Sequence, residues 1–286
     1  MRTIFWGTPQ VAVPFLEHLF SRTEVQGVVT QTDKPSQRGQ KTRESPVKVF
    51  AETHGIPIFQ PSSLKDEKFI SEISGLKAEA GIVVAYGRIL PRQVIESFLQ
   101  GIFNIHFSLL PILRGASPIQ HAILAGHSKT GVTSFRIAES LDTGHIVVQK
   151  EISISSEDTA ITLEQNLVPL GLEALEETLK IIESGQSQGK PQSGTSSYAP
   201  LIRKEDARIH WDRTAKEIDC QVRALIRLGT FCQLQDGKVL KILEAHPHPN
   251  PHSGHPLQRP SQWGTTPWFP LPLYHRPLRS LGDVPD

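Results

Sequence analysis

The first 185 residues alternate short apolar runs with segments of helical periodicity, and this alternation restricts the fold more than any other feature of the chain. The apolar runs are RTIFW (2–6), VQGVVT (25–30), IPIF (56–59), GIVVAY (81–86), GIFNIH (101–106), GVTSFRI (131–137) and HIVVQKEISI (145–154). Such alternation is typical of a mostly parallel β-sheet with helices on its faces. We therefore expect an α/β fold for this part of the protein.

Proline and glycine mark the expected helix boundaries. Segments 45–55 and 117–126 each begin with Ser-Pro and end with Gly, which predicts two helices with a serine N-cap, a proline in the first turn and a glycine stop. A longer helix is expected over 159–184, bent at Pro169, because a proline inside a helix removes a backbone hydrogen bond.

Composition divides the chain further. Residues 184–200 are dense in Gly, Ser, Gln and Pro, which predicts a linker between an N-terminal domain (1–183) and a small second domain (201–245) with a helix and one hairpin. Residues 246–286 hold 10 of the 22 prolines and 5 of the 12 histidines without any strand or helix period, so we expect them to be disordered. Two explanations of this change in composition stay open, an altered reading frame from residue 246 and a genuine tail.

The overall composition argues against several classes of protein. The net charge is +1, so any basic surface that binds nucleic acid must be local. Two cysteines are too few for a disulfide framework. No signal-peptide pattern and no apolar run near the roughly 20 residues of a membrane helix are visible, so we expect a soluble cytoplasmic protein. The segment WGTPQ (6–10) lacks the spaced glycines of dinucleotide-dependent oxidoreductases.

Two polar side chains interrupt the run GIFNIH. Asn104 and His106 are two residues apart, so on a strand they point to the same face, near its carboxyl end. In open α/β sheets, ligands bind in the crevice beyond those ends. The following segment, SLLPILRGASPI (108–119), is predicted to be a turn that leads into a helix. Both side chains are therefore expected on the floor of a crevice.

A carboxylate is expected at the same place. Asp142 stands before Thr143 and Gly144 at the start of another strand, from where it could reach the imidazole. A carboxamide and a protonated imidazole can stabilise a developing oxyanion, while the carboxylate keeps the imidazole charged and helps to remove a proton. The three groups suit acyl transfer to an amine. Purely structural roles stay open, since an aspartate before a glycine is usually a turn residue.

The segment between residues 33 and 48 is basic. Five cations against two anions give it a local charge of +3 without an apolar face, so we expect a mobile loop that could contact phosphates. A merely solvated loop is the alternative. Its charged residues are Lys34, Arg38, Lys41, Arg43 and Lys48, with Asp33 and Glu44.

The quoted motifs resemble a known family. NIHFSLLPILRGASPIQHAILAG followed by TGVTSFRIAESLDTGHIV closely resembles the signature of the formyltransferases that use 10-formyltetrahydrofolate. FWGTPQVAVPFLEHL, QTDKPSQRGQKTRESPVKVFAETHGIPIFQP, VVAYGRILP and YAPLIRKEDARIHWDRTAKEIDCQVRAL are similar to the members that act on initiator tRNA. The resemblance covers about residues 1–245, with the motifs in the same order and spacing.

The resemblance implies a fold and an activity. The fold would be an N-terminal Rossmann-like, mostly parallel sheet followed by a smaller OB-like β-barrel, which looks incomplete because only one hairpin is evident. Asn104, His106 and Asp142 would catalyse formyl transfer from 10-formyltetrahydrofolate to the α-amino group of methionyl initiator tRNA. Neither a metal nor a membrane is implied, and the protein would be a monomer.

The same resemblance implies two sets of binding residues. The basic loop would enter the acceptor end of the tRNA through Arg38, Lys41 and Arg43. Ser108 is expected in the folate pocket as a turn residue, not as a nucleophile, because no GxSxG surrounds it. The folate pocket, where backbone groups would hold the pterin, is expected along Val84, Ala85, Tyr86, Gly87, Arg88, Ile89, Leu90, Ser108, Leu109, Leu110, Pro111, Ala138, Glu139, Ser140 and Leu141.

Three other functions compete with this one. The chain could formylate a small amine, hydrolyse formyl-folate, or bind folate without acting on tRNA because its C-terminus is altered. The basic loop and the second domain favour tRNA, since an enzyme for a small amine needs neither.

Overall fold

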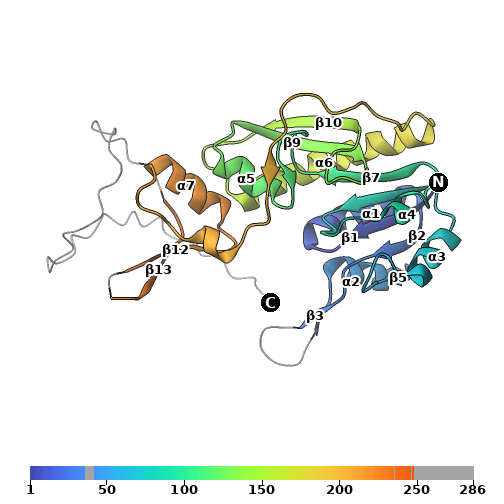
Figure 1. Cartoon of the computed structure of the whole chain (residues 1–286), viewed down its shortest axis with the longest axis horizontal. Coiled ribbons are helices and arrows are strands. Elements are labelled where there is room, and N and C mark those ends of the chain that lie inside the picture. The colour runs from blue at the N-terminus through green and yellow to red at the C-terminus, as the bar shows by residue number, and fades with distance from the viewer. Residues whose placement is uncertain (36–41, 235, 246, 248–286) are drawn as a thin grey trace, which may run out of the picture.

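A computed structural model describes residues 1–35, 42–234, 236–245 and 247 (Figure 1). Its main element is a seven-stranded sheet in the order β10-β9-β7-β6-β1-β2-β5. The five strands from β7 to β5 are parallel, whereas β9 is antiparallel to both β7 and β10. The strands are β1 (Arg2–Gly7), β2 (Glu24–Val29), β5 (Ile58–Phe59), β6 (Ala80–Val84), β7 (Gly101–His106), β9 (Lys129–Arg136) and β10 (Ile146–Ser153). The predicted α/β class with a mostly parallel sheet is confirmed.

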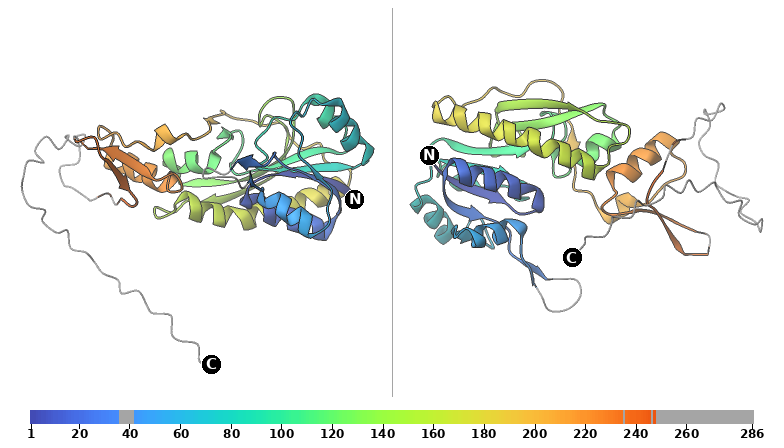
Figure 2. Two further views of the ribbon diagram at one scale, coloured as in Figure 1. Left: turned by 90° about the horizontal axis from the view of Figure 1, so that it is seen from below. Right: turned by 180° about the vertical axis from the view of Figure 1, so that it is seen from behind.

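Helices cover both faces of the sheet (Figures 1 and 2). One core cluster joins Phe5, Ile82 and Ile105 of the sheet to α1 and α6, and the other joins Trp6 and Val83 to α3 and α4. Because side chains alternate along a strand, neighbouring residues of β1 and β6 supply the two cores. The helices are α1 (Val13–Arg22), α2 (Pro46–Thr53), α3 (Glu67–Gly75), α4 (Arg92–Ile95), α5 (Pro118–Leu124) and α6 (Ala160–Glu183), with the 3₁₀ helix η1 (Gln10–Ala12).

The helix starts agree with the sequence in one case and differ in another. Ser45 caps α2, since its hydroxyl accepts a hydrogen bond from the backbone N–H of Lys48. Ser117 stands at the same position before α5, yet its hydroxyl accepts from the N–H of Ile202, a residue 85 positions further along the chain. A tertiary contact has replaced the predicted cap there. α6 is one helix that includes Pro169.

The strand expected over 81–86 is shorter than its apolar run. β6 ends at Val84, because Ala85 (φ +49°) and Gly87 (φ +78°) both have left-handed backbone conformations that a strand does not contain. The run therefore continues as a turn at the carboxyl edge of the sheet, although Tyr86 remains buried.

The C-terminal domain is small. It contains the 3₁₀ helix η2 (Lys204–Ala207), α7 (Ala215–Ala224) and a hairpin of β12 (Thr230–Gln233) and β13 (Val239–Ile242). The hairpin turns at Gly237, whose φ of +83° suits glycine, as expected. This is the single hairpin of the domain in the described residues, and the tail expected to be disordered lies outside them except for Pro247.

The segment predicted to be a linker is in contact with the sheet domain. After α6 it runs back over β10 and β9 to reach α7 (Figure 1), and Lys190 bridges to Ile146. Further along, β11 (Tyr198–Ala199) pairs in parallel with the short strand β8 (Arg114–Gly115). Two residues each of β3 (Lys34–Pro35) and β4 (Thr42–Arg43) complete the described strands. Among the residues that the structure describes, no helix is long and apolar enough to cross a membrane.

Candidate active site

Asn104 and His106 lie at the carboxyl end of β7, as the sequence predicts. Together with Ile102 they occupy one face of the strand, while Phe103 and Ile105 fill the core on the other face. The carboxamide of Asn104 is partly exposed and forms no hydrogen bond with any described residue. It is therefore available to a ligand.

His106 is buried and held from two sides. Its Nε2 lies 2.9 Å from the backbone oxygen of Leu113, and because a carbonyl can only accept, this nitrogen carries a proton. Its Nδ1 faces Oδ2 of Asp142 at 3.9 Å, which is too long for a hydrogen bond but short enough for charge attraction. The two contacts fix the plane of the ring. To donate a hydrogen bond to a substrate oxygen, the imidazole must either give up one of these two contacts or make both bonds from one nitrogen.

Asp142 comes from the loop between β9 and β10 and is brought to His106 as expected. Its carboxylate is nearly buried, and Oδ2 accepts a hydrogen bond of 2.7 Å from the backbone N–H of Gly115. The residue has φ +51°, a left-handed conformation that aspartate tolerates better than most residues. The backbone thus turns sharply here to aim the carboxylate inward. The carboxylate thus faces the imidazole of His106 from the loop side of the site.

The predicted folate segment after β6 presents its backbone. The side chains of Val84, Tyr86 and Leu90 are buried, so these residues can reach a ligand only through backbone groups. The turn is held by Gln31, whose Nε2 donates to the oxygen of Tyr86 at 2.6 Å. Among the described residues, no backbone hydrogen bond uses Ala85, Gly87 or Ile89. These backbone groups can therefore form hydrogen bonds with a ligand.

Arg88 has a structural contact in this segment. Its guanidinium donates to the backbone oxygens of Pro61 and Ser62, both at 2.9 Å, and so ties the turn to the loop before α3. The side chain of Ile89 is the exposed apolar group of the segment.

The second predicted folate segment, 108–111, is held from within. Ser108 is buried and donates its hydroxyl proton to the oxygen of Ile112 at 2.6 Å, which makes it a turn residue as expected. Thr133 donates to the oxygen of Ser108 and accepts from the N–H of Leu110. Leu110 is buried and joined to Pro111 by a cis peptide bond. Leu109 is partly exposed.

The third predicted segment is the exposed approach to Asp142. Ala138, Glu139, Ser140 and Leu141 all lie at the surface. The backbone oxygen of Ser140 accepts from the hydroxyl of Thr143, which helps to form the turn at Asp142. All three segments border the edge of the sheet at the carboxyl ends of its parallel strands. Asn104, His106 and Asp142, called the trio below, converge at this edge.

The basic segment is partly neutralised at its base. Lys48 forms ion pairs with Asp33 and Glu44, both at 2.7 Å, and its hydrogen bond to Asp33 raises the pKa of its ammonium group. The same bond is the main cause that lowers the pKa of Asp33. Lys48 is thus not available to a partner. Of the expected tRNA-binding residues, Arg43 lies in β4, whereas Arg38 and Lys41 fall outside the described residues.

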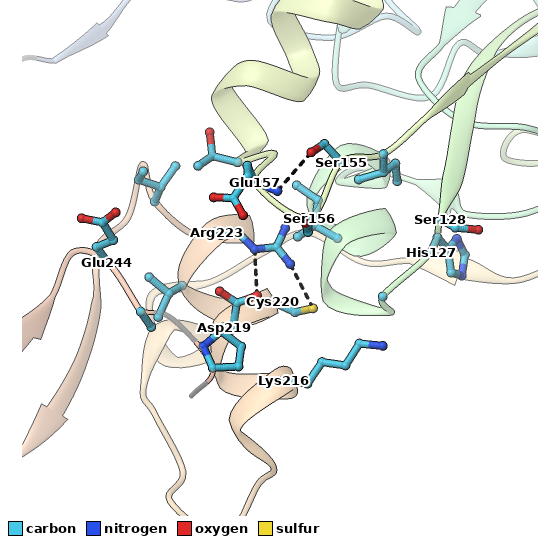
Figure 3. A pocket seen from close by; sticks show the side chains of 18 of the residues that line it. His127, Ser128, Ser155, Ser156, Glu157, Lys216, Asp219, Cys220, Arg223 and Glu244 are labelled. Carbon is cyan, nitrogen blue, oxygen red and sulfur yellow. Dashed lines mark hydrogen bonds and ion pairs between the residues drawn. The ribbon is translucent and has the colours of Figure 1, made fainter. Parts of the chain in front are cut away.

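A separate hollow of about 700 Å³ lies between the sheet domain and α7 (Figure 3). Arg223 crosses it, donating to Asp219, to the sulfur of Cys220 and to the backbone oxygen of Asp158. Its charge is therefore satisfied internally, and neither Asn104, His106 nor Asp142 lines this hollow. Nor is any group of three metal-ligating side chains found in the ranges that the structure describes.

Sequence reasoning missed the groups that hold the trio. The backbone N–H of Gly115 holds Asp142 and the backbone oxygen of Leu113 holds His106, whereas the side chain of Gln31 holds the turn after β6. No spacing rule indicates these contacts. The one available signal was Gly115, whose φ of +116° requires glycine.

Comparison with known proteins gives a consistent result. Residues 1–179 match the formyl transferase family, and residues 201–266 match the formyl transferase C-terminal domain. A methionyl-tRNA formyltransferase from Alkaliphilus oremlandii is 42% identical over 85% of this chain and 79% of its own length. One from Thermodesulfovibrio yellowstonii is 46% identical over 77% of this chain and 72% of its own. An N-formyltransferase from Helicobacter canadensis, solved with folinic acid and dTDP-3-aminofucose, superposes with a TM-score of 0.61 at 23% identity, covering 84% of this chain and 86% of that one.

Proposed function

The chain belongs to the formyl transferase family, and from this premise we propose that it transfers a formyl group from 10-formyltetrahydrofolate to the α-amino group of methionine on initiator tRNA. The observation that carries the proposal is the convergence of Asn104, His106 and Asp142 at the carboxyl end of β7. The relatives that are 42% and 46% identical carry the name of this activity.

Each residue of the trio has a chemical task. 10-Formyltetrahydrofolate, when bound, supplies the formyl carbon, and the amine forms a C–N bond to that carbon as the bond to the folate nitrogen breaks. The free carboxamide of Asn104 donates a hydrogen bond to the oxygen on which negative charge develops. His106 stabilises the same charge as a cation, which Asp142 favours. Asp142 also accepts the proton that the amine loses, and this proton passes to the folate nitrogen as tetrahydrofolate leaves.

The residues around the trio fit a folate. The unused backbone groups of Ala85, Gly87 and Ile89 can bind the pterin edge, and the exposed loop before Asp142 borders them. The related N-formyltransferase of known structure was solved with folinic acid, which supports a folate as the one-carbon donor.

The position of the basic hairpin supports a tRNA substrate. β3 and β4 follow β2, which is parallel to β7, so the hairpin leaves the sheet at the edge where the trio lies. The hairpin and the C-terminal domain both stand beyond this edge (Figures 1 and 2). The cations that the sequence carries between residues 34 and 43 suit an acceptor stem, because phosphate neutralisation dominates nucleic-acid affinity. We also propose that the protein is a monomer and that it acts in translation in the cytoplasm.

Formyl transfer to methionyl initiator tRNA tests the proposal. The full chain is incubated with 10-formyltetrahydrofolate and charged initiator tRNA, and formylmethionine is measured after mild hydrolysis of the ester. Charged elongator tRNA and dTDP-3-aminofucose serve as competing amines, and a reaction without an amine measures release of formate. Preferred formylation of initiator tRNA is expected. Faster reaction with the amino sugar or with water would replace the proposal with one of those activities.

A further inference from the structure

The interdomain segment 190–200 contacts both groups that hold His106. Beyond Lys190 it follows the surface of the sheet domain, and it returns as β11 beside β8, directly next to Leu113. Within the described residues, Gln192 and Ser197 are the two side chains of this segment that form hydrogen bonds with the loops of the active site. Neither was singled out by the sequence.

All hydrogen-bonding positions of the Gln192 carboxamide are used. Its Oε1 accepts from Nε and one terminal nitrogen of Arg114, at 3.2 and 2.6 Å. Its Nε2 donates to the backbone oxygens of Asp142 and Gly144, at 2.8 and 2.9 Å. One side chain therefore joins β8 to the turn that carries the catalytic carboxylate. That turn has a left-handed residue at its centre, which persists only where surrounding contacts hold it.

Ser197 holds the other side of the imidazole. Its Oγ accepts from the N–H of Leu113 at 2.9 Å, and its backbone oxygen accepts from the N–H of Arg114 at 2.9 Å. Leu113 also has a left-handed backbone, with φ +61°, and its oxygen accepts the proton on Nε2 of His106. Ser197 thus fixes the residue that orients the ring.

We propose that Gln192 and Ser197 are positioning residues of formyl transfer, through which the interdomain segment sets the orientation of His106 against Asp142. This inference rests on the proposed function for its kinetic test. Nε2 of the imidazole depends on Leu113 and Ser197, and the carboxylate that faces Nδ1 depends on Gln192. A shift of about 1 Å in either group lowers a rate as strongly as loss of a contact in the site itself.

Gln192→Glu is the sharpest variant. It keeps the size of the side chain and the acceptor for Arg114 but replaces the donor that binds Asp142 and Gly144 with a carboxylate oxygen. Gln188→Glu introduces the same charge just before the segment, at an exposed residue whose side chain forms no hydrogen bond with any described residue. We expect kcat for methionyl-tRNA to fall on the order of 10- to 100-fold in Gln192→Glu, with KM unchanged, and to stay constant in Gln188→Glu.

A serine pair provides the second comparison. Ser197→Ala removes the acceptor for Leu113, whereas Ser196→Ala changes an exposed neighbour without a hydrogen bond to the described residues. Ser197→Thr keeps the hydroxyl. We expect kcat to fall in Ser197→Ala, to recover in Ser197→Thr and to stay constant in Ser196→Ala. A loss of thermal stability with unchanged kcat in Gln192→Glu and Ser197→Ala would overturn the proposal, since it would show a structural role alone.

A readout without substrate separates this inference from the proposed function. The ring nitrogens of His106 are followed by ¹⁵N NMR in the full chain and its variants. We expect their resonances to move in Gln192→Glu and Ser197→Ala but not in the two controls. If the unaltered protein formylates no tRNA while these shifts occur, the proposed function fails and the positioning role stands. Unchanged resonances in both variants would overturn the positioning role, whatever the activity.

Discussion

The sheet domain and the C-terminal domain are stabilised in different ways. The sheet has a separate core on each face, and both cores include its central strands. The C-terminal domain has a small core of its own, formed by Ile209, Ile218, Val222 and Cys232. The opposite side of α7 contributes Cys220, Ala224 and Leu225 to the large core of the sheet domain.

This difference assigns a different role to each region, catalysis to the sheet domain and substrate binding to the C-terminal domain. Asn104 and His106 stand on β7, a strand buried from both sides, where a side chain can be held within a fraction of an ångström, and Asp142 reaches them from the loop between β9 and β10. The C-terminal domain depends on α7, on Arg223 and on the paired hydrogen bonds from Arg227 to Glu164. Changes in the first region should therefore affect turnover, and changes in the second should affect attachment or substrate binding.

The largest effect is expected from Asn104→Ala. Removal of an oxyanion donor should lower kcat on the order of 10²- to 10³-fold. Stability should not change, because the Asn104 carboxamide has no partner among the described residues. Single-turnover formyl transfer and the thermal midpoint measure the two quantities, with Asn166→Ala on the exposed side of α6 as the control. Near-normal turnover would remove Asn104 from the mechanism.

Arg223→Leu should weaken the joint between the domains. It leaves the nearly buried carboxylate of Asp219 without its partner, which should destabilise the C-terminal domain by about 3 kcal/mol. Calorimetry should then show this domain unfolding before the sheet domain, while folate binding is retained. The exposed Arg213→Leu is the matched control. Simultaneous unfolding of both domains would mean that they form one cooperative unit.

Arg38→Ala should affect the tRNA and not the folate. Loss of one phosphate contact should raise KM for tRNA about tenfold and reduce the slope of log K against log salt by about one. The affinity of the same variant for folate reports whether the sheet domain is intact, and it should stay constant. An equal loss of both affinities would assign the loop a structural role.

The smallest effect concerns a joint within the sheet domain, between α1 and α6. Hydrogen bonding by Arg22 lowers the pKa of Glu176 to about 2. Because the folded-state pKa is lowered, this contribution is complete above the ordinary carboxyl pKa of about 4.5 and is lost as the pH falls towards 2. Arg22 is 44% exposed, so water and salt weaken the pair.

Glu176→Gln should therefore lower the thermal midpoint at neutral pH by no more than about 2 °C. The difference from the unaltered protein should shrink as the pH falls from 4.5 to 2. A difference that does not depend on pH would mean that the ion pair contributes nothing and that only packing changed.

Much of the fold followed from the sequence because the determining signals are local. The apolar runs around Phe5, Ile82 and Phe103 are the strands, and Ser45 caps the helix that follows it. Two predictions were wrong in detail, namely the strand over the whole of 81–86 and the N-cap at Ser117. In both places a turn or a contact with a distant residue determines the backbone, and periodicity carries no information on either.

The sequence by itself determined the α/β class, the placement of Asn104 and His106 on one face of β7, and Asp142 as the partner of His106. It did so because a strand's two-residue period and the parallel arrangement of strands fix which side chains meet at one edge. The tertiary structure alone decided how His106 is held, through the Leu113 carbonyl, and which segment supports that contact. The hydrogen bond from Leu113 to Ser197 joins residues 84 positions apart and is set by chain folding in space. Composition could therefore identify residues 184–200 as a connection but not as a neighbour of His106.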